Sequence, residues 1–161
     1  MGPAEIPSKR RFVYRFFKWH SDRRGLPFTM PPSHPFNPLP ALRLALVAGP
    51  DLDTVRTIFH HIYGEGKQPD SAEVISVLAD KLGVDDVVAQ LSDPIIKETL
   101  RSNTDEAVKT GVFGVPTFLV NGELFWGDDA TDMLLDYLKN PDLFKTREMA
   151  RLSSMPMGVE R

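Results

Sequence analysis

The 161-residue sequence contains no cysteine. Without a thiol, the chain itself cannot form a disulfide, a thiolate metal site or a thiol-based redox centre. It also lacks an apolar run close to the ~20 residues of a transmembrane helix, and its first residues lack a signal-peptide core. The net charge of −3 gives no indication of nucleic-acid binding. These absences predict a cytoplasmic protein whose partners include neither nucleic acid nor membrane.

The histidines do not form a metal-binding pattern. His60 and His61 are adjacent on a predicted helix, so their side chains point about 100° apart and cannot share one metal ion. His20 and His34 have no acidic or histidine neighbour at ligand spacing. The sequence also has no glycine-rich phosphate loop. We therefore predict neither a metal ion nor a nucleotide cofactor.

Prolines are abundant, and many of the fourteen fall between Leu26 and Pro40. Their density excludes the interior of a helix. The same stretch carries Phe28, Met30 and Phe36, whose apolar side chains a solvated linker would not need. We predict an ordered, extended connector that docks on the rest of the protein.

Helical patterns occur on both sides of this connector. Residues 8–24 are expected to form a helix capped by Ser8, with aromatic side chains on one face and basic side chains on the other. Further helices are expected over residues 41–48, after Asp51 or Asp53, after Asp70 or Ser71, over 85–91, from Pro94 to about Thr110, and after Asp128 or Asp129. Two strands therefore stand against six or seven helices.

Both strands belong to one β-hairpin centred on Asn121-Gly122. An Asn-Gly pair between two apolar runs favours a two-residue type I′ turn. This turn predicts the pairs Val120–Glu123, Leu119–Leu124, Phe118–Phe125 and Thr117–Trp126. Each face of the ribbon then carries large apolar side chains, which predicts helices on both faces.

The predicted hairpin has no obvious partner strand in residues 1–110. An isolated hairpin is marginally stable in water, and its free edges promote association. Three explanations remain open: a second copy supplies cover in a homodimer, the hairpin is covered in a way the sequence does not show, or the chain is the larger part of a longer fold.

The string GVFGVPTF at residues 111–118, with NGELFWGDD at 121–129, resembles the glutathione-dependent 2-hydroxychromene-2-carboxylate isomerases. These are relatives of the kappa-class glutathione transferases in the DsbA-like branch of the thioredoxin fold. The segments 7–27 and 35–38 fit the same family, so the resemblance runs from residue 1 to about residue 138. It implies an α/β, thioredoxin-like (DsbA-like) fold with a large all-helical insertion, N-terminally truncated and predominantly helical, with one β-hairpin near the C-terminus.

The resemblance also implies a domain organisation. Residues 1–139 form one domain, in which 8–110 are the helical part and 111–139 are the hairpin and a helix, and 140–161 form a partly ordered tail. The strand-helix-strand unit that carries the family's catalytic serine would precede Met1, so no catalytic residue is assigned. The chain as given is therefore expected to lack isomerase activity unless that unit is supplied.

The implied cofactor is glutathione, and the implied substrates are aromatic catabolites of the 2-hydroxychromene-2-carboxylate type. Two alternatives remain open. One is a kappa-like glutathione transferase, which would share the binding site but not the reaction. The other is a non-catalytic module that dimerises through the exposed hairpin.

The resemblance assigns cofactor binding to two segments. It implies a cis bond at Val115-Pro116 and pairing of the Val115 backbone with the cysteinyl part of glutathione. The alternative is an ordinary tight turn. It further implies that the segment Trp126-Gly127-Asp128-Asp129 holds the γ-glutamyl end. The alternative there is that one aspartate caps the next helix.

Two more residues are implied to contact the substrate side. Lys9 matches a basic residue near the carboxylate of glutathione or of the substrate, whereas a solvated basic helix face is the alternative. Asn37 matches an asparagine that faces the aromatic substrate, although it could equally cap the following helix.

Overall fold

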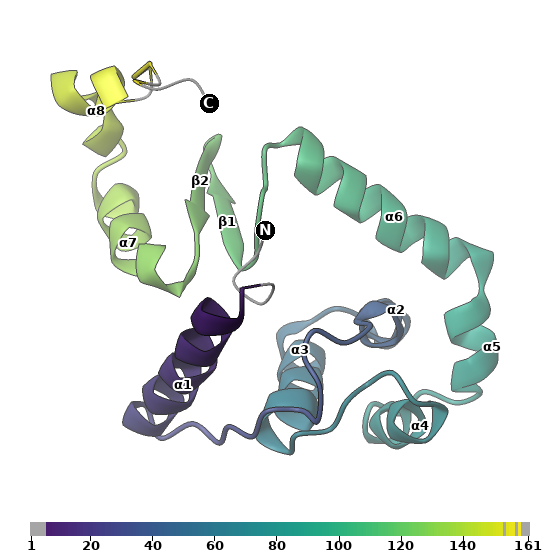
Figure 1. Ribbon diagram of the computed structural model, residues 1–161. Helices are drawn as coiled ribbons and strands as arrows, with labels where there is room; N and C mark the ends of the chain where they lie inside the picture. Colours follow the sequence, from purple (N-terminus) through teal and green to yellow (C-terminus); the bar gives the residue numbers. More distant parts are fainter. Residues whose placement is uncertain (1–5, 153, 157, 159–161) are drawn as a thin grey trace. The chain divides into compact units, whose positions relative to one another are not determined.

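The computed structural model describes residues 6–152, 154–156 and 158, which are mainly helical (Figure 1). The chain divides into two compact units, residues 1–103 and residues 104–161. The helices are α1 (Pro7–Arg23), α2 (Leu39–Ala48), α3 (Leu52–Phe59), the π-helix η2 (His60–Gly64), α4 (Ala72–Lys81), α5 (Val87–Ser92), α6 (Pro94–Lys109), the 3₁₀ turns η3 (Asp128–Ala130) and η4 (Leu143–Lys145), α7 (Thr131–Lys139) and α8 (Arg147–Leu152). Within the described ranges, no helix has both the length and the apolar character to cross a bilayer.

Side-chain caps fix the starts of several helices in the first unit. Asp51 accepts a hydrogen bond of 2.8 Å from the N–H three residues later, and Ser71 does the same over 3.2 Å. These contacts show that Asp51, not Asp53, caps α3 and that Ser71, not Asp70, caps α4. Such caps satisfy N–H groups that have no partner within the helix.

The start of α1 differs from the prediction. The helix begins at Pro7 with Ile6 in the N-cap position, and no side chain caps it, so the prediction of Ser8 as a cap is wrong. The physical reason is that the fixed φ of a proline suits the first helical position, where its missing N–H costs nothing. Ser8 therefore lies inside the first turn.

The core of the first unit lies among α2, α3, α4 and α5. Leu44 of α2 and Leu78 of α4 are completely buried at its centre. The other buried members are Ala41, Ile58, Ile62, Ile75, Ala79, Val84 and Val87. Burial of each large aliphatic side chain contributes about 1.5–3 kcal/mol. These helices therefore form a core that does not depend on the second unit.

The proline-rich connector docks on this core, as predicted. Phe28 stacks on the ring of Tyr63 with ring centroids 6.2 Å apart, and Phe36 approaches the same ring at 6.3 Å. Burial among these rings raises the pKa of the Tyr63 phenol. The connector also contains a cis bond at His34-Pro35, which the sequence analysis did not predict.

The second unit contains the hairpin of β1 (Thr117–Val120) and β2 (Glu123–Trp126). Its four residue pairs have the predicted register, and the strands are antiparallel. At the turn, Asn121 and Gly122 have φ values of 52° and 88°, as a type I′ turn requires. The hairpin predicted from the Asn121-Gly122 pair is therefore confirmed, both in its register and in its turn.

The hairpin packs against helices on one face only. On that face Phe125 is buried against Leu134 and Tyr137 of α7, and the ring of Phe144 stacks on Phe125 at 5.9 Å. On the opposite face Leu119 and Trp126 are about half exposed. The prediction of helical cover on both faces is thus wrong for the described part of this unit. The physical reason is that α7 and η4 both cover the same side of β2.

Candidate functional site

The Val115-Pro116 peptide bond is cis, as the family resemblance implied. It lies immediately before β1, and Val115 is 86% exposed. Among the described residues, neither the N–H nor the carbonyl of Val115 has a hydrogen-bond partner. An exposed pair of unused backbone groups can form hydrogen bonds with the backbone of a bound peptide.

Antiparallel pairing brings the end of β2 beside this turn. Thr117 lies opposite Trp126, so the residues that follow Trp126 lie next to the residues that precede Thr117. The N–H of Gly127 donates a hydrogen bond of 2.9 Å to the carbonyl of Pro116. The hairpin therefore joins both predicted cofactor-binding segments into one site, which we name the turn site: Val115, Pro116, Trp126, Gly127, Asp128 and Asp129.

Gly127 shapes the acidic side of the turn site. Its φ of 90° and ψ of 162° belong to a region that only glycine occupies readily. A Cβ atom at this position would collide with Oδ1 of Asp129, so the carboxylate of Asp129 lies directly beside the Cα of Gly127. This carboxylate makes no hydrogen bond to another described residue. It is available to a cationic group.

The two aspartates do not cap α7. Both lie in η3, and the N-cap of α7 is Ala130, which has no side-chain cap. The prediction that Asp128 or Asp129 caps this helix is therefore wrong. The reason is the additional 3₁₀ turn, which places both aspartates one turn before the helix. The carbonyl of Asp128 instead accepts a hydrogen bond of 2.7 Å from the Thr131 hydroxyl.

Trp126 covers the other side of the turn site. Its indole lies so close to Gly114 that a Cβ atom there would collide with Nε1. The ring of Phe113 meets the indole edge-on at 5.1 Å, and Trp126 remains 52% exposed. Sequence reasoning missed these two contacts. The only signal in the sequence was Gly114, directly before the Val115-Pro116 turn. It does not point to Trp126, which occupies the space beside this glycine but lies twelve positions further along the chain.

Lys9 and Asn37 do not belong to the unit that contains the turn site. Lys9 is exposed in the first turn of α1. Asn37 is also exposed, and its Oδ1 accepts a hydrogen bond of 3.1 Å from the N–H of Leu39, the first residue of α2. Asn37 therefore has a local role just before α2, but the N-cap position of that helix is Pro38, so the alternative that Asn37 caps the helix is wrong. Contact with a substrate stays a prediction for both residues.

A histidine buried in the first unit forms a separate polar cluster. His61 is 2% exposed, and its Nδ1 lies 3.1 Å from Glu65, which in turn accepts a hydrogen bond of 2.7 Å from Lys81. Burial lowers the pKa of His61, and the charge of Lys81 lowers it further. The hydrogen bond from Lys81 lowers the pKa of Glu65. Nε2 of His61 has no partner.

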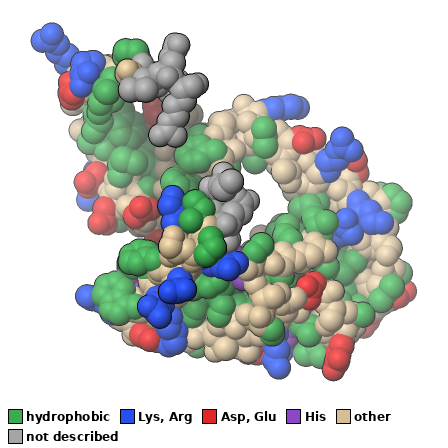
Figure 2. Space-filling model, viewed as in Figure 1, with side chains coloured by type: hydrophobic (Ala, Val, Ile, Leu, Met, Phe, Trp, Pro, Cys, Tyr) green, Lys and Arg blue, Asp and Glu red, His purple; other side chains and the backbone are tan. Residues whose placement is uncertain are grey.

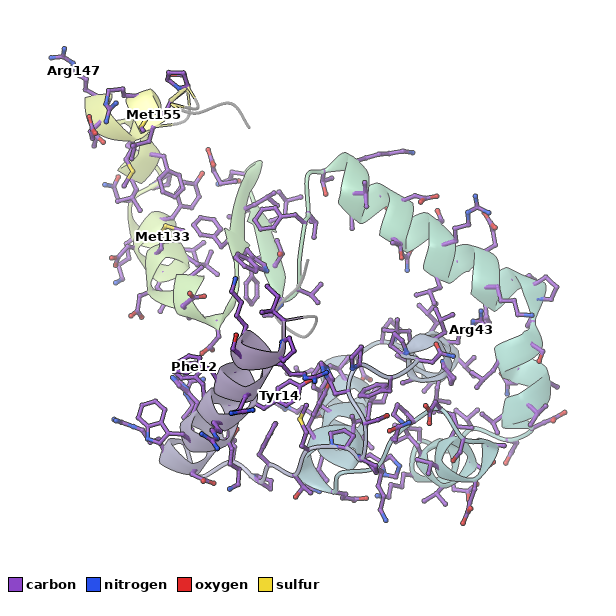
Figure 3. The ribbon with its side chains drawn as sticks, in the orientation of Figure 1. Phe12, Tyr14, Arg43, Met133, Arg147 and Met155 are labelled. Atoms are coloured by element: carbon purple, nitrogen blue, oxygen red, sulfur yellow. The ribbon has the colours of Figure 1, made fainter. Side chains whose placement is uncertain are left out.

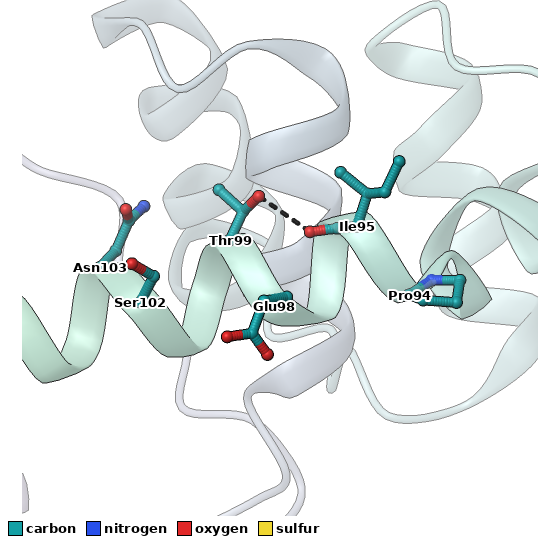
Figure 4. A pocket seen from close by; sticks show the side chains of 6 residues that line it. All are labelled: Pro94, Ile95, Glu98, Thr99, Ser102 and Asn103. Carbon is teal, nitrogen blue, oxygen red and sulfur yellow. Dashed lines mark hydrogen bonds between the residues drawn. The ribbon is translucent and has the colours of Figure 1, made fainter.

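A further concave feature of the described surface is an open hollow along α6 (Figure 4). Its lining comes from one face of that helix: Pro94, Ile95, Glu98, Thr99, Ser102 and Asn103. The Thr99 hydroxyl donates its hydrogen bond within the helix, to the carbonyl of Ile95. No group of three or more metal-ligating side chains occurs among the described residues. The described lining of the hollow therefore does not include such a metal-binding group.

Comparison with known proteins identifies relatives of two kinds. The chain is 34% identical over 82 residues to 2-hydroxychromene-2-carboxylate isomerase from Pseudomonas putida, an alignment that covers 50% of this chain and 40% of the relative. It is 28% identical over 159 residues to glutathione S-transferase kappa 2 from Caenorhabditis elegans, with coverage of 86% and 70%. The chain thus spans less than half the length of the isomerase relative that it matches.

The fold has a counterpart among solved structures. A structure of selenomethionine 2-hydroxychromene-2-carboxylate isomerase matches with a TM-score of 0.78 at 24% sequence identity, over 96% of this chain and 75% of the other. The likeness confirms the expected thioredoxin-like architecture. The model of the DSBA-like thioredoxin domain matches residues 1–139. The chain therefore belongs to the DSBA-like thioredoxin domain family.

Proposed function

We propose that the turn site binds glutathione. We further propose that the protein is a glutathione-dependent isomerase-family member acting on aromatic catabolites of the 2-hydroxychromene-2-carboxylate type. The observation that carries the proposal is the hydrogen bond from the Gly127 N–H to the Pro116 carbonyl, which joins the backbone of Val115 to the acidic turn. Support from relatives comes from proteins named for the isomerase and for the kappa transferase.

The chemistry of the turn site fits that of glutathione. The tripeptide offers a peptide N–H and C=O at its cysteinyl residue, and the Val115 backbone has the complementary pair of groups unused. Its γ-glutamyl end carries an ammonium group, which the unpaired carboxylate of Asp129 attracts. The indole of Trp126 covers one side of the turn and offers an apolar surface to the ligand. When bound, glutathione supplies the thiol that this chain lacks.

The residues of the chain have binding roles in this proposal. Asp128 and Asp129 orient the γ-glutamyl end, and Val115 orients the peptide that carries the sulfur. Lys9 and Asn37 are proposed to contact the carboxylate and the aromatic part of the substrate. No residue of the chain is assigned a proton transfer, so these assignments concern binding and orientation alone.

Binding is tested by titrating the chain with glutathione in calorimetry and in ¹H–¹⁵N correlation spectra. We expect millimolar or tighter binding, with the largest shifts at the amides of Val115 and Asp129. Asp129→Asn should weaken binding about tenfold, which equals ~1.4 kcal/mol. Glu123→Gln is the matched control, because it removes an exposed carboxylate at the other end of the same hairpin. Absence of heat and of shifts with the unmodified chain would reject the proposal.

A kappa-like glutathione transferase is the second candidate. The longer alignment, with the kappa-class relative, supports this candidate because it covers 86% of this chain. The two activities differ in the fate of the cofactor, because an isomerase regenerates free glutathione whereas a transferase consumes it. Free thiol measured during turnover of the whole protein therefore separates them. Glutathione binding without either activity would favour a non-catalytic module.

A further inference from the structure

Helix α1 is held on the first unit by one side only. None of its seventeen residues is buried. Its anchor is Tyr14, whose hydroxyl hydrogen-bonds Nδ1 of His34 over 2.7 Å and also approaches the His34 carbonyl at 3.2 Å. Figure 3 shows Tyr14 and Phe12 on different sides of the helix. The side of α1 away from Tyr14 is therefore exposed within this unit.

The exposed side carries a row of aromatic rings. Phe12, Phe16 and Trp19 follow one another at helical spacing. Phe12 stacks on Phe16 with centroids 6.1 Å apart, and Phe16 meets Trp19 at 5.9 Å. Phe12 is 69% exposed, and the other two are about half exposed. We name these three residues the aromatic face of α1. Their rings form one apolar strip along the helix.

The charge of α1 is strongly positive. Its basic residues are Lys9, Arg10, Arg11, Arg15, Lys18 and Arg23. Asp22 is its only acidic residue, and it is paired with Lys18. Figure 2 shows basic side chains interspersed with hydrophobic ones over this helix. The whole chain has a net charge of −3, so the basic charge of α1 is a local feature that the overall composition hides.

Several of these cations border the aromatic face. Arg11 and Arg15 each stand one position before a phenylalanine of this face, so both lie along the same edge of it. Neither forms an ion pair with another described residue. The guanidinium of Arg23 lies over the indole of Trp19, 5.1 Å from the ring centroid. The apolar strip is therefore flanked by positive charge, two members of which are free to meet an anion.

This pattern distinguishes between two kinds of anionic partner. Nucleic-acid bases are recognised through their edges, for which asparagine and glutamine are typical side chains. Helix α1 contains neither. A helix with phenylalanine and tryptophan on one side and lysine and arginine beside them is typical of segments that lie in the interface of a bilayer. Tryptophan in particular is enriched at that depth. The composition of α1 therefore favours a lipid surface.

We infer that α1 binds the surface of a bilayer that contains anionic phospholipid. The helix lies parallel to the surface, with the aromatic face below the headgroups and the arginines at the level of the phosphates. The expectation of no membrane partner came from the absence of a spanning segment, and a helix that lies in the interface needs none. No residue of the turn site takes part, so this inference is independent of glutathione binding.

The test is co-sedimentation of the full chain with vesicles of equal parts phosphatidylcholine and phosphatidylserine. The unmodified chain should sediment with these vesicles, but not with vesicles of phosphatidylcholine alone. Raised salt should release it, because salt screens the attraction between the arginines and the lipid. Absence of binding to the phosphatidylserine vesicles at low salt would overturn the inference.

Charge reversal tests the basic edge. Arg11→Glu with Arg15→Glu should weaken vesicle binding by roughly a hundredfold or more. The matched control is Lys97→Glu with Lys109→Glu on α6, which changes the net charge equally and should bind like the unmodified chain. Circular dichroism checks that both variants are folded. Equal losses in the two folded variants would show that only net charge matters, and the inference would fail.

Loss of rings tests the aromatic face. Phe12→Ala with Phe16→Ala keeps every charge and should weaken vesicle binding by about tenfold. Val77→Ala with Val88→Ala, which also shortens two exposed apolar side chains, should have no effect. Tryptophan emission of the unmodified chain should move to shorter wavelength with vesicles, and Trp19→Phe should remove most of this shift.

Two results would assign the face to another partner. If a DNA duplex displaces the chain from vesicles and binds the phenylalanine variant as tightly as the unmodified chain, α1 binds nucleic acid through charge alone. If the unmodified chain self-associates and its tryptophan emission does not respond to vesicles, the rings are covered by a second copy. Either result would overturn the inference.

Discussion

The two units of the chain bury apolar side chains to very different extents. In residues 1–103, four helices surround a core in which Leu44 and Leu78 are completely buried. Among the described residues of 104–161, the buried core consists of Phe125, Leu134 and Tyr137, and Leu119 and Trp126 on the other face of the hairpin are about half exposed. The first unit thus holds its shape by packing, whereas the described part of the second leaves apolar side chains and backbone polar groups exposed. Four substitutions test this difference.

The largest effect is expected for Phe125→Ala. This side chain is 1% exposed and contacts both other buried members of the small core. Its loss should cost about 4 kcal/mol and unfold the second unit. Hydrogen exchange should show protection lost from β1, β2 and α7 but kept in α2–α5. Simultaneous loss in both units would show that the smaller core is not separate.

Leu78→Ala is the corresponding change in the larger core. We expect a loss of about 3 kcal/mol in the free energy of unfolding, from urea denaturation. More neighbours remain in this core, so α2–α5 should stay folded in water. Val77→Ala, at the adjacent exposed position, is the control and should cost much less. Equal losses for the two variants would contradict the proposed position of the core.

Gly127→Ala should have a smaller effect on stability and a larger one on the ligand. The backbone conformation of Gly127 disfavours a side chain by roughly 1–3 kcal/mol, and the new Cβ would displace the Asp129 carboxylate. Gly122→Ala imposes a positive φ without any neighbour within 4 Å. Both variants should lose stability, but only Gly127→Ala should weaken glutathione binding. Equal affinity in the two variants would exclude Asp129 from the binding site.

The smallest effect is the pH dependence of His61. Its pKa in the folded state is lowered below the ordinary value of 6.5, so the unfolded chain binds the proton first. The contribution of neutral His61 to the free energy of unfolding is therefore complete above pH 6.5 and decreases as the pH falls below that value. Thermal unfolding between neutral and mildly acidic pH measures this slope. His61→Gln should flatten the curve, whereas His60→Gln, at the exposed neighbouring position, should retain it.

Features that depend on residues close together in the sequence could be predicted from the sequence alone. The register of the hairpin follows from the Asn121-Gly122 turn, because a two-residue loop permits a single set of pairs. Ser71 and Asp51 were among the expected caps, since a cap requires only a suitable side chain before an apolar stripe. Two helix starts were predicted wrongly: α1 begins at Pro7, and the 3₁₀ turn η3 precedes α7. Each feature shifts the start by only a few residues, which the apolar pattern does not resolve.

Features that join distant residues were not predictable in this way. The hydrogen bond between Tyr14 and His34 spans twenty positions, and the approach of Trp126 to Gly114 spans twelve. Nothing local distinguishes these pairs from other residues of the same types. The turn site itself was predicted through the family resemblance, and the antiparallel pairing of β1 with β2 explains why its two segments meet.

The position of Trp126 gives the protein a built-in optical reporter. The chain has two tryptophans, Trp19 and Trp126. After Trp19→Phe, selectively excited emission would come from the indole that lies against Gly114 and Phe113. Any molecule that enters beside Val115 would change the wavelength or intensity of that emission. Occupancy could then be followed in real time without attaching a dye.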